Sequence, residues 1–546
     1  MMERAESGQK LYTRLRLWEF PDQYVIEPTD GSSASSLVVS RADGSMSLTD
    51  EVPECSSVRV PKIRAIFGVV GLLKLVASSH LVVITDRECA GSYLGQPIFK
   101  VKSLKILPCD HSLKNSSIEQ KKVENEFSAL LNVLERTSGL YFSYDTNLTL
   151  SAQRLHDLGD ECKLLPLWRQ SDYSFVLEGT RMWRRGADPD GYVANFVETE
   201  QIFQMKGFTA SFVQVRRSIP FLWEQIVDLT YKPEFEIVRH EEAPQVAERH
   251  FLDMRKKYGS VLAVDLVNKH GRRLSEKYAN AMQHILSDDV RYLHFDFHQV
   301  CGHIHFERLS ILYEQIVDVL KKNWYFLLNE KGEKMKEQLG VVRTNCIDCL
   351  DRTNVTQSMI GQIMLETQLR RIGVFGAEET ISSHPNFDES FKILWANHGD
   401  EISIQYSGTP ALKGDFVRCG QRTAQGILRD GWNALARYYL NNFRDGTKQD
   451  AIDLLHGHYI ASVSRDLTPA TQTGGLEAVA SFPLALSLVM VGFLFATMSL
   501  RKAPNDLRHL FFSMVWASMS IGVAAVMRAN GRIFCNRPRL HRPSWH

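Results

Sequence analysis

The sequence predicts an α/β protein in which a β-rich N-terminal domain packs on an α/β domain that a C-terminal transmembrane helical hairpin follows. Strand-like runs alternate with amphipathic helical stretches over residues 175–455, which is the pattern of an α/β sheet. Residues 1–165 are rich in β-forming runs and contain one helical stretch, about 118–137,. Two long uncharged runs near the C-terminus supply the hairpin,.

Composition sets the broad class. The 546 residues are 44% apolar and 23% charged, which is ordinary for a globular protein of several domains and excludes wholesale disorder. Lys and Arg number 64 against 63 Asp and Glu, and this balance argues against a general nucleic-acid binder. Nine irregularly spaced cysteines predict a reduced, cytosolic setting rather than a disulfide framework. The N-terminus lacks the apolar core of a cleaved signal peptide.

The elements of the N-terminal domain follow from local patterns. Residues 66–84 resemble a membrane segment but contain Lys74 and His80, with β-branched residues in two blocks. We therefore expect two core strands around a turn. The Ser- and Gly-rich stretch 31–48 predicts a loop,.

In the α/β domain, VLAVDLV (261–267) and VRYLHFDFHQV (290–300) predict strands, and residues 309–320 predict an amphipathic helix,. Residues 462–475 have linker composition,. The expected segments are a β-rich domain (1–165), an α/β domain (175–455), a linker (456–475), two transmembrane helices (476–530) and a basic tail (531–546).

The hairpin rests on hydropathy. Residues 478–500 contain no charge over 23 positions, and residues 510–527 contain none over 18, whereas about 20 residues cross a bilayer as a helix. The alternative is a pair of buried core helices. By the positive-inside rule, the arginines that follow the second run place the tail, and with it the large N-terminal part, in the cytosol: Arg528, Arg532, Arg537, Arg539 and Arg542. A cytosolic body would also keep three glycosylation sequons unmodified: Asn115, Asn147 and Asn354.

The stretch 341–371 carries the chemistry. Cys346 and Arg352 form a Cys-x5-Arg pattern that is followed by Thr353, between a strand-like run and an amphipathic helix. Five intervening residues let backbone amides curl around an anion, while the arginine grips two phosphate oxygens. The helix N-terminus points at the same anion and lowers the pKa of the cysteine. The pattern predicts a phosphate cradle with a thiolate nucleophile.

Other readings of these residues remain open. Cys346 could be a buried structural cysteine near a surface arginine. Cys346 and Cys349 also form Cys-x2-Cys, the spacing of a zinc or redox pair, but the chain lacks a second such pair. No metal or other cofactor is expected, because Arg352 and the loop amides supply the positive field.

Several blocks together resemble the Sac-domain phosphoinositide phosphatases over about residues 10–455, and the C-terminal hairpin resembles that family's membrane-anchored branch. The blocks are CIDCLDRTN (346–354), GTRMWRRGADPDGYVANFVETEQI (179–202), VQVR with Ser-Ile-Pro (213–220), HFDFHQVCG (294–302), DEISIQYSGTPALKGDFVRCGQRT (400–423) and YFSYDTNLTLSAQR (141–154).

The resemblance implies the removal of phosphate from phosphatidylinositol monophosphates, chiefly the 4-phosphate, on the cytosolic face of the endoplasmic reticulum, Golgi or secretory vesicles. It implies that Cys346 forms a cysteinyl-phosphate, that Arg352 binds the phosphoryl group, and that Thr353 hydrogen-bonds to the sulfur. Substrate contacts are expected from the rest of the loop and from basic residues outside it: Asn345, Ile347, Cys349, Leu350, Arg216, Lys413 and Arg418. Arg181 and Arg184 are further candidates, although an ordinary surface or ion-pair role is the more common outcome for any one of these basic residues.

The general acid is left open between Asp348 and Asp351, which both lie inside the loop. Either aspartate would protonate the inositol oxygen as it leaves and then activate water, or would instead orient Arg352. Other family blocks add Asp296, His298 and Asp400 as candidates.

The sequence departs from the family in two places. Arg217 stands where the family has a glycine, and a positive φ there would strain it. The stretch before Gly179 is several tens of residues shorter than in the family, which weakens the prediction of folding and activity. The shortened stretch gives one alternative to a lipid phosphatase, a phosphoinositide-binding or tethering protein without turnover. A second alternative is a phosphatase that uses the same loop on phosphoproteins.

Overall fold

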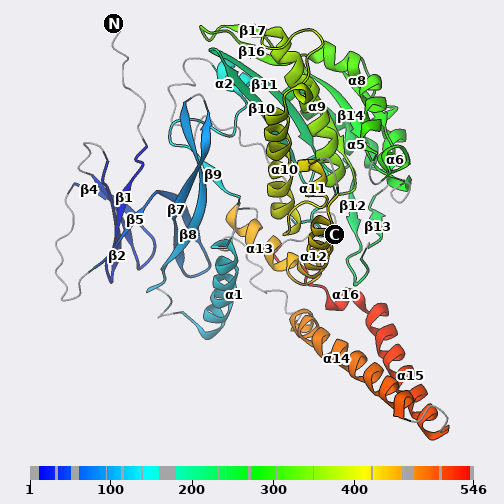
Figure 1. Ribbon diagram of the computed structural model, residues 1–546. Coiled ribbons are helices and arrows are strands. Elements are labelled where there is room, and N and C mark those ends of the chain that lie inside the picture. The colour runs from blue at the N-terminus through cyan, green and yellow to red at the C-terminus, as the bar shows by residue number, and fades with distance from the viewer. Residues whose placement is uncertain are drawn as a thin grey trace.

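The computed structural model has the predicted α/β fold, with a sheet-rich N-terminal region and two apolar C-terminal helices (Figure 1). It describes residues 11–540 apart from 31–34, 51–60, 94, 112, 114–115, 137–138, 159–179, 232, 240, 269–271, 303–304, 349, 420–421, 458, 460, 462–472 and 503–506. The stretch before Gly179 that we expect to be shortened lies outside the described residues, as do most of the expected linker, Asn115 and Cys349.

The N-terminal region contains two antiparallel sheets. The first has the order β4-β3-β2-β1-β5, and the second has the order β6-β7-β8-β9. Their strands are β1 (Leu15–Glu19), β2 (Gln23–Pro28), β3 (Ser36–Ser40), β4 (Met46–Thr49), β5 (Lys62–Ile66), β6 (Gly68–Lys74), β7 (Ser79–Tyr93), β8 (Gln96–Cys109) and β9 (Tyr141–Phe142). Leu17, Val39, Leu81 and Leu107 pack in the core between the sheets.

Three sequence predictions for this region can be compared with it. The two strands expected within 66–84 are confirmed as β6 and the start of β7. The helix expected near 118–137 is α1 (Ile118–Leu134), whose N-terminus is closed by a capping box between Ser117 and Gln120,. The loop expected over 31–48 is wrong, because β3 and β4 form there and bury Val39 against the core. Its Ser and Gly residues obscured this short alternating pattern.

The sheet of the α/β domain has the order β15-β14-β18-β11-β16-β17, with β10 paired to β11. Its strands are β10 (Val197–Met205), β11 (Phe208–Arg216), β14 (Ser260–Asp265), β15 (Val290–His294), β16 (Phe326–Leu328), β17 (Lys334–Lys336) and β18 (Gly340–Asn345), and β12 (Trp223–Gln225) pairs with β13 (Phe235–Ile237) beside it. β18 runs parallel to β14 and β11, and all six of its residues are buried. A loop that leaves the carboxyl end of such a central parallel strand is a common place for ligands to bind.

Helices cover both faces of this sheet (Figure 1). They are α5 (Ala243–Tyr258), α6 (Arg272–Met282), α7 (Phe297–Cys301), α8 (Leu309–Asn323), α9 (Asp351–Arg371), α10 (Pro385–Ser407), α11 (Gly414–Cys419), α12 (Ala424–Phe443) and α13 (Asp445–Leu455). α8 contains the predicted helix 309–320. It packs with α9 on one face, whereas α5 and α6 pack on the other.

The N-terminal region contacts the catalytic domain at several points. Phe127, Leu131 and Leu134 of α1 pack against Ala451 and Leu454 of α13. At a second point, α2 (Ala152–Asp157) packs on β16. The predicted packing of the β-rich domain on the α/β domain is therefore present.

The C-terminal helices α14 (Thr473–Lys502) and α15 (Leu507–Ala529) form a hairpin that projects away from the rest of the molecule (Figure 1). The segments Phe482–Arg501 and Leu507–Ala529 are long and apolar enough to cross a membrane, and 17% of each most apolar stretch is buried. Because core helices would be mostly buried, this exposure favours the membrane reading. After α15, α16 (Gly531–Phe534) leads the chain back onto α13, where the Asp450 carboxylate accepts hydrogen bonds from the amides of Arg539 and Leu540.

Candidate active site

The Cys-x5-Arg loop lies between β18 and α9. β18 ends at Asn345, Cys346 follows at once, and α9 begins at Asp351. The Cys346 thiol is 2% exposed, and the fully buried Thr353 hydroxyl donates to its sulfur at 3.6 Å. This hydrogen bond and the N-terminus of α9 both favour a negatively charged sulfur.

Arg352 lies on the pocket side of α9. Its Nη1 donates to the carbonyl of Leu266, just beyond β14, at 3.0 Å. A pocket beside it is lined by Asp351, Arg352, Asn354, Lys413 and Gly414, among others. Basic side chains therefore face the same pocket from α9 and from the turn before α11, which suits a phosphorylated ligand.

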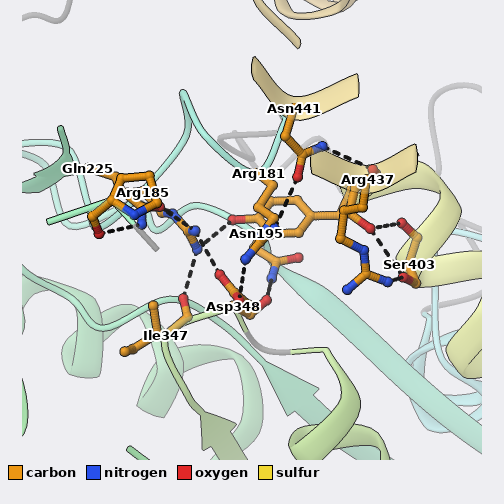
Figure 2. Close-up of polar contacts among 12 residues, drawn as sticks. Arg181, Arg185, Asn195, Gln225, Ile347, Asp348, Ser403, Arg437 and Asn441 are labelled. Carbon is orange, nitrogen blue, oxygen red and sulfur yellow. Dashed lines mark hydrogen bonds and ion pairs between the residues drawn. The ribbon is translucent and has the colours of Figure 1, made fainter. Parts of the chain in front are cut away.

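Asp348 is held by two guanidinium groups (Figure 2). Arg181 Nη2 lies 2.9 Å from its Oδ2, and Arg185 Nη2 lies 2.7 Å from its Oδ1. Asn195 donates to the Asp348 carbonyl, and Arg185 Nη1 donates to the carbonyl of Ile347. Burial alone would raise the pKa of Asp348, but the two arginines outweigh it and hold this pKa far below its usual range. Asp348 is therefore a stable carboxylate that fixes the shape of the loop.

Asp351 has the opposite environment. Its carboxylate accepts a hydrogen bond from the amide of Leu412 at 3.0 Å, and its side chain lines the pocket. Burial raises the pKa of Asp351, although the charge of Arg437 opposes the rise. The pKa values of the two aspartates between which the sequence could not choose are thus shifted in opposite directions. Two arginines pair directly with Asp348, whereas burial is the largest influence on Asp351.

The remaining predicted substrate-binding residues fall into two groups. Lys413 lines the pocket, and burial lowers its pKa. Arg418 is paired with Asp400 on α10. By contrast, Asn345 is fully buried between Arg343 and Asp265. Arg216 is also fully buried, and donates to Gln357 of α9 at 2.7 Å.

Two further predicted residues, one in the loop and one in another family block, support the fold rather than line the pocket. Leu350 packs with Ile402 and Tyr406. Asp296 caps α7, and its carboxylate accepts from the amides of His298 and Gln299. The structure therefore gathers Cys346, Asp348, Asp351, Arg352, Thr353 and Lys413 around one loop and pocket and leaves Arg216, Asn345 and Asp296 in supporting positions.

Sequence reasoning missed Arg185. It singled out Arg181 and Arg184, but Arg184 forms a buried ion pair with Asp453 of α13. The amide of Arg184 donates to the carbonyl of Thr180, so the chain makes a helical turn here. Residues four apart share a side of such a turn, and this spacing was the available signal that Arg181 acts with Arg185. Asn195, which lies just before β10, carried no such signal.

The strain expected at Arg217 is absent. Among the described non-glycine residues, positive φ occurs at Asn195, Lys206, Arg239, Trp324 and Lys413, and Arg217 is not one of them. Its guanidinium lies over the ring of Phe196, 3.7 Å from the centroid. Strain depended on a positive φ at this position, and Arg217 does not have one,.

Comparisons with known proteins agree with this geometry. The family described as SacI homology domain matches residues 67–176 and 159–302. The chain is 68% identical to the phosphoinositide phosphatase SAC7 of Arabidopsis thaliana over 99% of this chain and 100% of that protein. It is 43% identical to the Arabidopsis phosphoinositide phosphatase SAC8, over 98% of each chain. It is 31% identical to the phosphatidylinositol-3-phosphatase SAC1-A of Danio rerio, over 97% of this chain and 98% of the other.

The alignment with SAC7 also shows a difference in length. It extends over 595 positions, whereas this chain has 546 residues, so at least 49 positions of that relative have no counterpart here.

Proposed function

Because this chain belongs to the Sac family of phosphoinositide phosphatases, we propose that it releases phosphate from phosphatidylinositol monophosphates, chiefly the 4-phosphate, through a cysteinyl-phosphate intermediate. The observation that carries the proposal is the Cys346-x5-Arg352 loop, which leaves the carboxyl end of the buried central strand β18 and opens α9. That placement gives the loop a rigid support and an anion-attracting helix end.

In the first step the Cys346 thiolate attacks phosphorus, a sulfur–phosphorus bond forms, and the bond from phosphorus to the inositol oxygen breaks. Thr353, which donates to the sulfur at 3.6 Å, stabilises the thiolate before attack and the sulfur as a leaving group afterwards. Arg352 holds the phosphoryl oxygens. To do so, the Arg352 guanidinium gives up its hydrogen bond to the Leu266 carbonyl and donates to the phosphoryl oxygens instead.

Asp351 is the general acid in this proposal. The departing inositol oxygen is a poor leaving group unless it is protonated, and burial raises the pKa of Asp351, which favours its protonated form. In the second step the same carboxylate accepts a proton from water as the water attacks the cysteinyl-phosphate. Asp348 is a positioning residue, because Arg181 and Arg185 keep it ionised.

The enzyme acts on lipid in the membrane that holds it. The two apolar helices anchor it, and the basic residues after α15 favour a cytosolic catalytic domain on the endoplasmic reticulum, Golgi or secretory vesicles. Anchorage raises the effective concentration of the enzyme for lipid head groups. The zebrafish relatives are named phosphatidylinositol-3-phosphatases, so the 3-phosphate is the first competing substrate to assay.

A second function is favoured by one observation. The chain lacks at least 49 positions present in SAC7, and we place this shortening before Gly179, at the start of the catalytic domain. If it impairs the reaction, the protein binds phosphoinositide and tethers membranes without turnover.

The test uses the full chain reconstituted in phosphatidylcholine vesicles that contain phosphatidylinositol 4-phosphate or 3-phosphate. We expect phosphate release from the 4-phosphate to be faster, and Cys346→Ser to abolish release from both. Cys89→Ser, at an exposed cysteine on β7, is the matched control and should keep full activity. Folded protein that binds the lipid without releasing phosphate would support tethering. Faster release from phosphotyrosine peptides would favour a phosphoprotein phosphatase.

A further inference from the structure

Helix α12 has the reverse of the usual amphipathic pattern. Leu428, Trp432, Leu435 and Tyr439 are 77%, 70%, 61% and 50% exposed, respectively. Their spacing of four, three and four residues places them in one stripe along the helix. The opposite side is buried and polar, with Asn433, Arg437 and Asn441.

Helix α12 cannot rotate so that the apolar stripe faces the protein interior. Arg437 donates to the Thr409 hydroxyl at 3.0 Å and to the Pro410 carbonyl at 2.9 Å. Asn441 donates to the Ser407 carbonyl and accepts from Arg181, as Figure 2 shows for the latter contact. Turning α12 about its axis would break these buried hydrogen bonds, each of which leaves a costly unpaired group. The apolar stripe is therefore fixed on the outside.

The stripe is continuous with the hairpin at one end. The ring of Phe443, the last residue of α12, lies 4.7 Å from the ring of Phe482 in α14, and Phe482 lies 5.9 Å from Phe534 in α16. Figure 1 shows α12, α13 and α16 gathered at the end of the catalytic domain from which α14 and α15 project.

The other end of α12 adjoins the candidate active site. Asp430 in its first part accepts a hydrogen bond from the amide of Lys413 at 2.9 Å, and Lys413 lines the pocket together with Arg352. The stripe thus runs from the side of the pocket to the base of the membrane helices.

We propose that this α12 stripe (Leu428, Trp432, Leu435 and Tyr439) lies in the head-group region of the bilayer that holds the hairpin, and so sets the catalytic pocket against the lipid surface. The inference rests on the proposed membrane anchorage. We infer that a bilayer, rather than another protein, covers the stripe. Helix α12 is joined to a transmembrane helix by aromatic contacts, so it lies close to the surface of the membrane that this helix crosses. The apolar side chains leave water there.

The charges beside the stripe fit an anionic leaflet. Arg429 of α12 and Arg444, which follows the last residue of α12, are exposed. The acid of α12, Asp430, is paired with Arg422 at 2.8 Å. Exposed arginines next to an apolar stripe are the pattern of helices that lie in the interface of membranes with anionic lipids.

The direct test measures the depth of Trp432. The full chain is reconstituted in phosphatidylcholine–phosphatidylserine vesicles with and without brominated acyl chains, which quench nearby indoles. The emission of Trp432 is obtained as the difference between wild type and Trp432→Phe. We expect this emission to be weaker in vesicles with brominated acyl chains than in vesicles without them. The matched control is Trp324→Phe, at a partly exposed tryptophan that follows α8, and the component lost there should be unquenched. An unquenched Trp432 component overturns the proposal, as does a disulfide between two copies of a Leu435→Cys variant in vesicles, which would assign the stripe to a second copy.

A functional test separates docking from catalysis. Leu428→Ser combined with Leu435→Ser should lower phosphate release from long-chain lipid in vesicles by about tenfold, because two buried leucines are lost from the interface, and should leave release from a water-soluble short-chain phosphoinositide unchanged. Leu48→Ser with Ile118→Ser, at exposed positions of the N-terminal region, should change neither rate. Equal losses on both substrates, or no loss on vesicles, would overturn the proposal. If wild-type protein hydrolyses neither substrate, the proposed function fails while the quenching result still decides the docking.

Discussion

The region around Asp348 and the region formed by α12 and the hairpin break the usual arrangement of side chains in opposite ways. Near Asp348, arginines are buried: the side chain of Arg185 is 2% exposed, and Arg216 and Arg343 are fully buried. Along α12 and the hairpin, large apolar side chains are exposed. A buried charge is tolerated only when an opposite charge or a hydrogen-bonding group pairs with it. An exposed apolar surface of this extent indicates contact with a membrane or with another protein.

One helix joins the two regions. On one side of α13, Asp453 pairs with Arg184 at 2.8 Å, and Gln449 accepts from the amide of Thr180. On the other side, Asp450 accepts from the tail that follows the hairpin. The turn that carries Arg181 and Arg185 and the chain that returns from the membrane are thus both fixed to α13. The position of the catalytic loop and the position of the hairpin therefore depend on the same helix, α13.

The largest expected effect comes from changing the acid in the polar region. Asp351→Asn should lower kcat for phosphatidylinositol 4-phosphate by about 10²–10⁴-fold, the usual contribution of a positioned acid. The loss should be much smaller for p-nitrophenyl phosphate, whose leaving group departs without a proton. Because the acid must be protonated, the wild-type rate falls as pH rises through the raised pKa of Asp351, and the variant should lose this alkaline limb. Equal losses on both substrates would contradict the assignment.

The next largest effect tests whether the buried ion pairs are structural. Asp348→Leu leaves Arg185 buried without its carboxylate and should lower the free energy of unfolding by about 3–5 kcal/mol. The matched control is Asp289→Leu, which breaks an exposed pair with Arg255 and should cost about 0–1 kcal/mol. Chemical unfolding of the full chain in detergent micelles measures both. Similar losses in the two variants would mean that burial adds nothing to the Asp348 cluster.

The sequence predicts some parts of this molecule well for physical reasons. The strands within 66–84, the helix near 118–137 and the two hairpin helices depend on local periodicity and hydropathy, which one chain contains in full. The position of the Cys346 loop between a strand and a helix was likewise visible from local patterns,.

Other features depend on contacts between distant residues. Asp348 and Asp351 look alike in the sequence, and only the arrival of Arg181 and Arg185 from a turn more than 150 positions away distinguishes them. The same holds for Arg216, which seemed suited to a head group but is bound to Gln357 inside the domain. The stripe on α12 was readable from its periodicity, but the sequence did not tell which side of the helix faces outward.

A smaller effect concerns the tail that links the hairpin to α13. Burial raises the pKa of Asp450 to about 7. Between about pH 4 and about pH 7 Asp450 therefore keeps a proton in the folded chain that it releases in the unfolded chain, so its contribution to stability falls as pH rises through this window,. Asp450→Asn should reduce that fall, and the exposed Asp288→Asn should not. Buried histidines such as His250, whose pKa burial lowers, act in the opposite direction, so the test is the difference between the melting temperatures of wild type and Asp450→Asn from pH 5 to pH 8. A difference that does not change with pH would refute the assignment. Asp445, whose pKa burial also raises to about 7, keeps a contribution of the same sign in the variant.

The smallest effect concerns an ion pair that is neither buried nor apolar. Lys100 of β8 pairs with Glu401 of α10 between the N-terminal region and the catalytic domain, and both side chains are partly exposed, at 25% and 33%. Glu401→Gln should cost about 0.2–1 kcal/mol, and the difference should vanish in about 1 M salt, where the Debye length is ~3 Å. Leu131→Ala, in the apolar contact between α1 and α13, should cost about 2–5 kcal/mol at either salt concentration. If Glu401→Gln cost as much as Leu131→Ala, charge rather than apolar packing would hold the two domains together, and the contrast between buried and exposed ion pairs would fail at this interface.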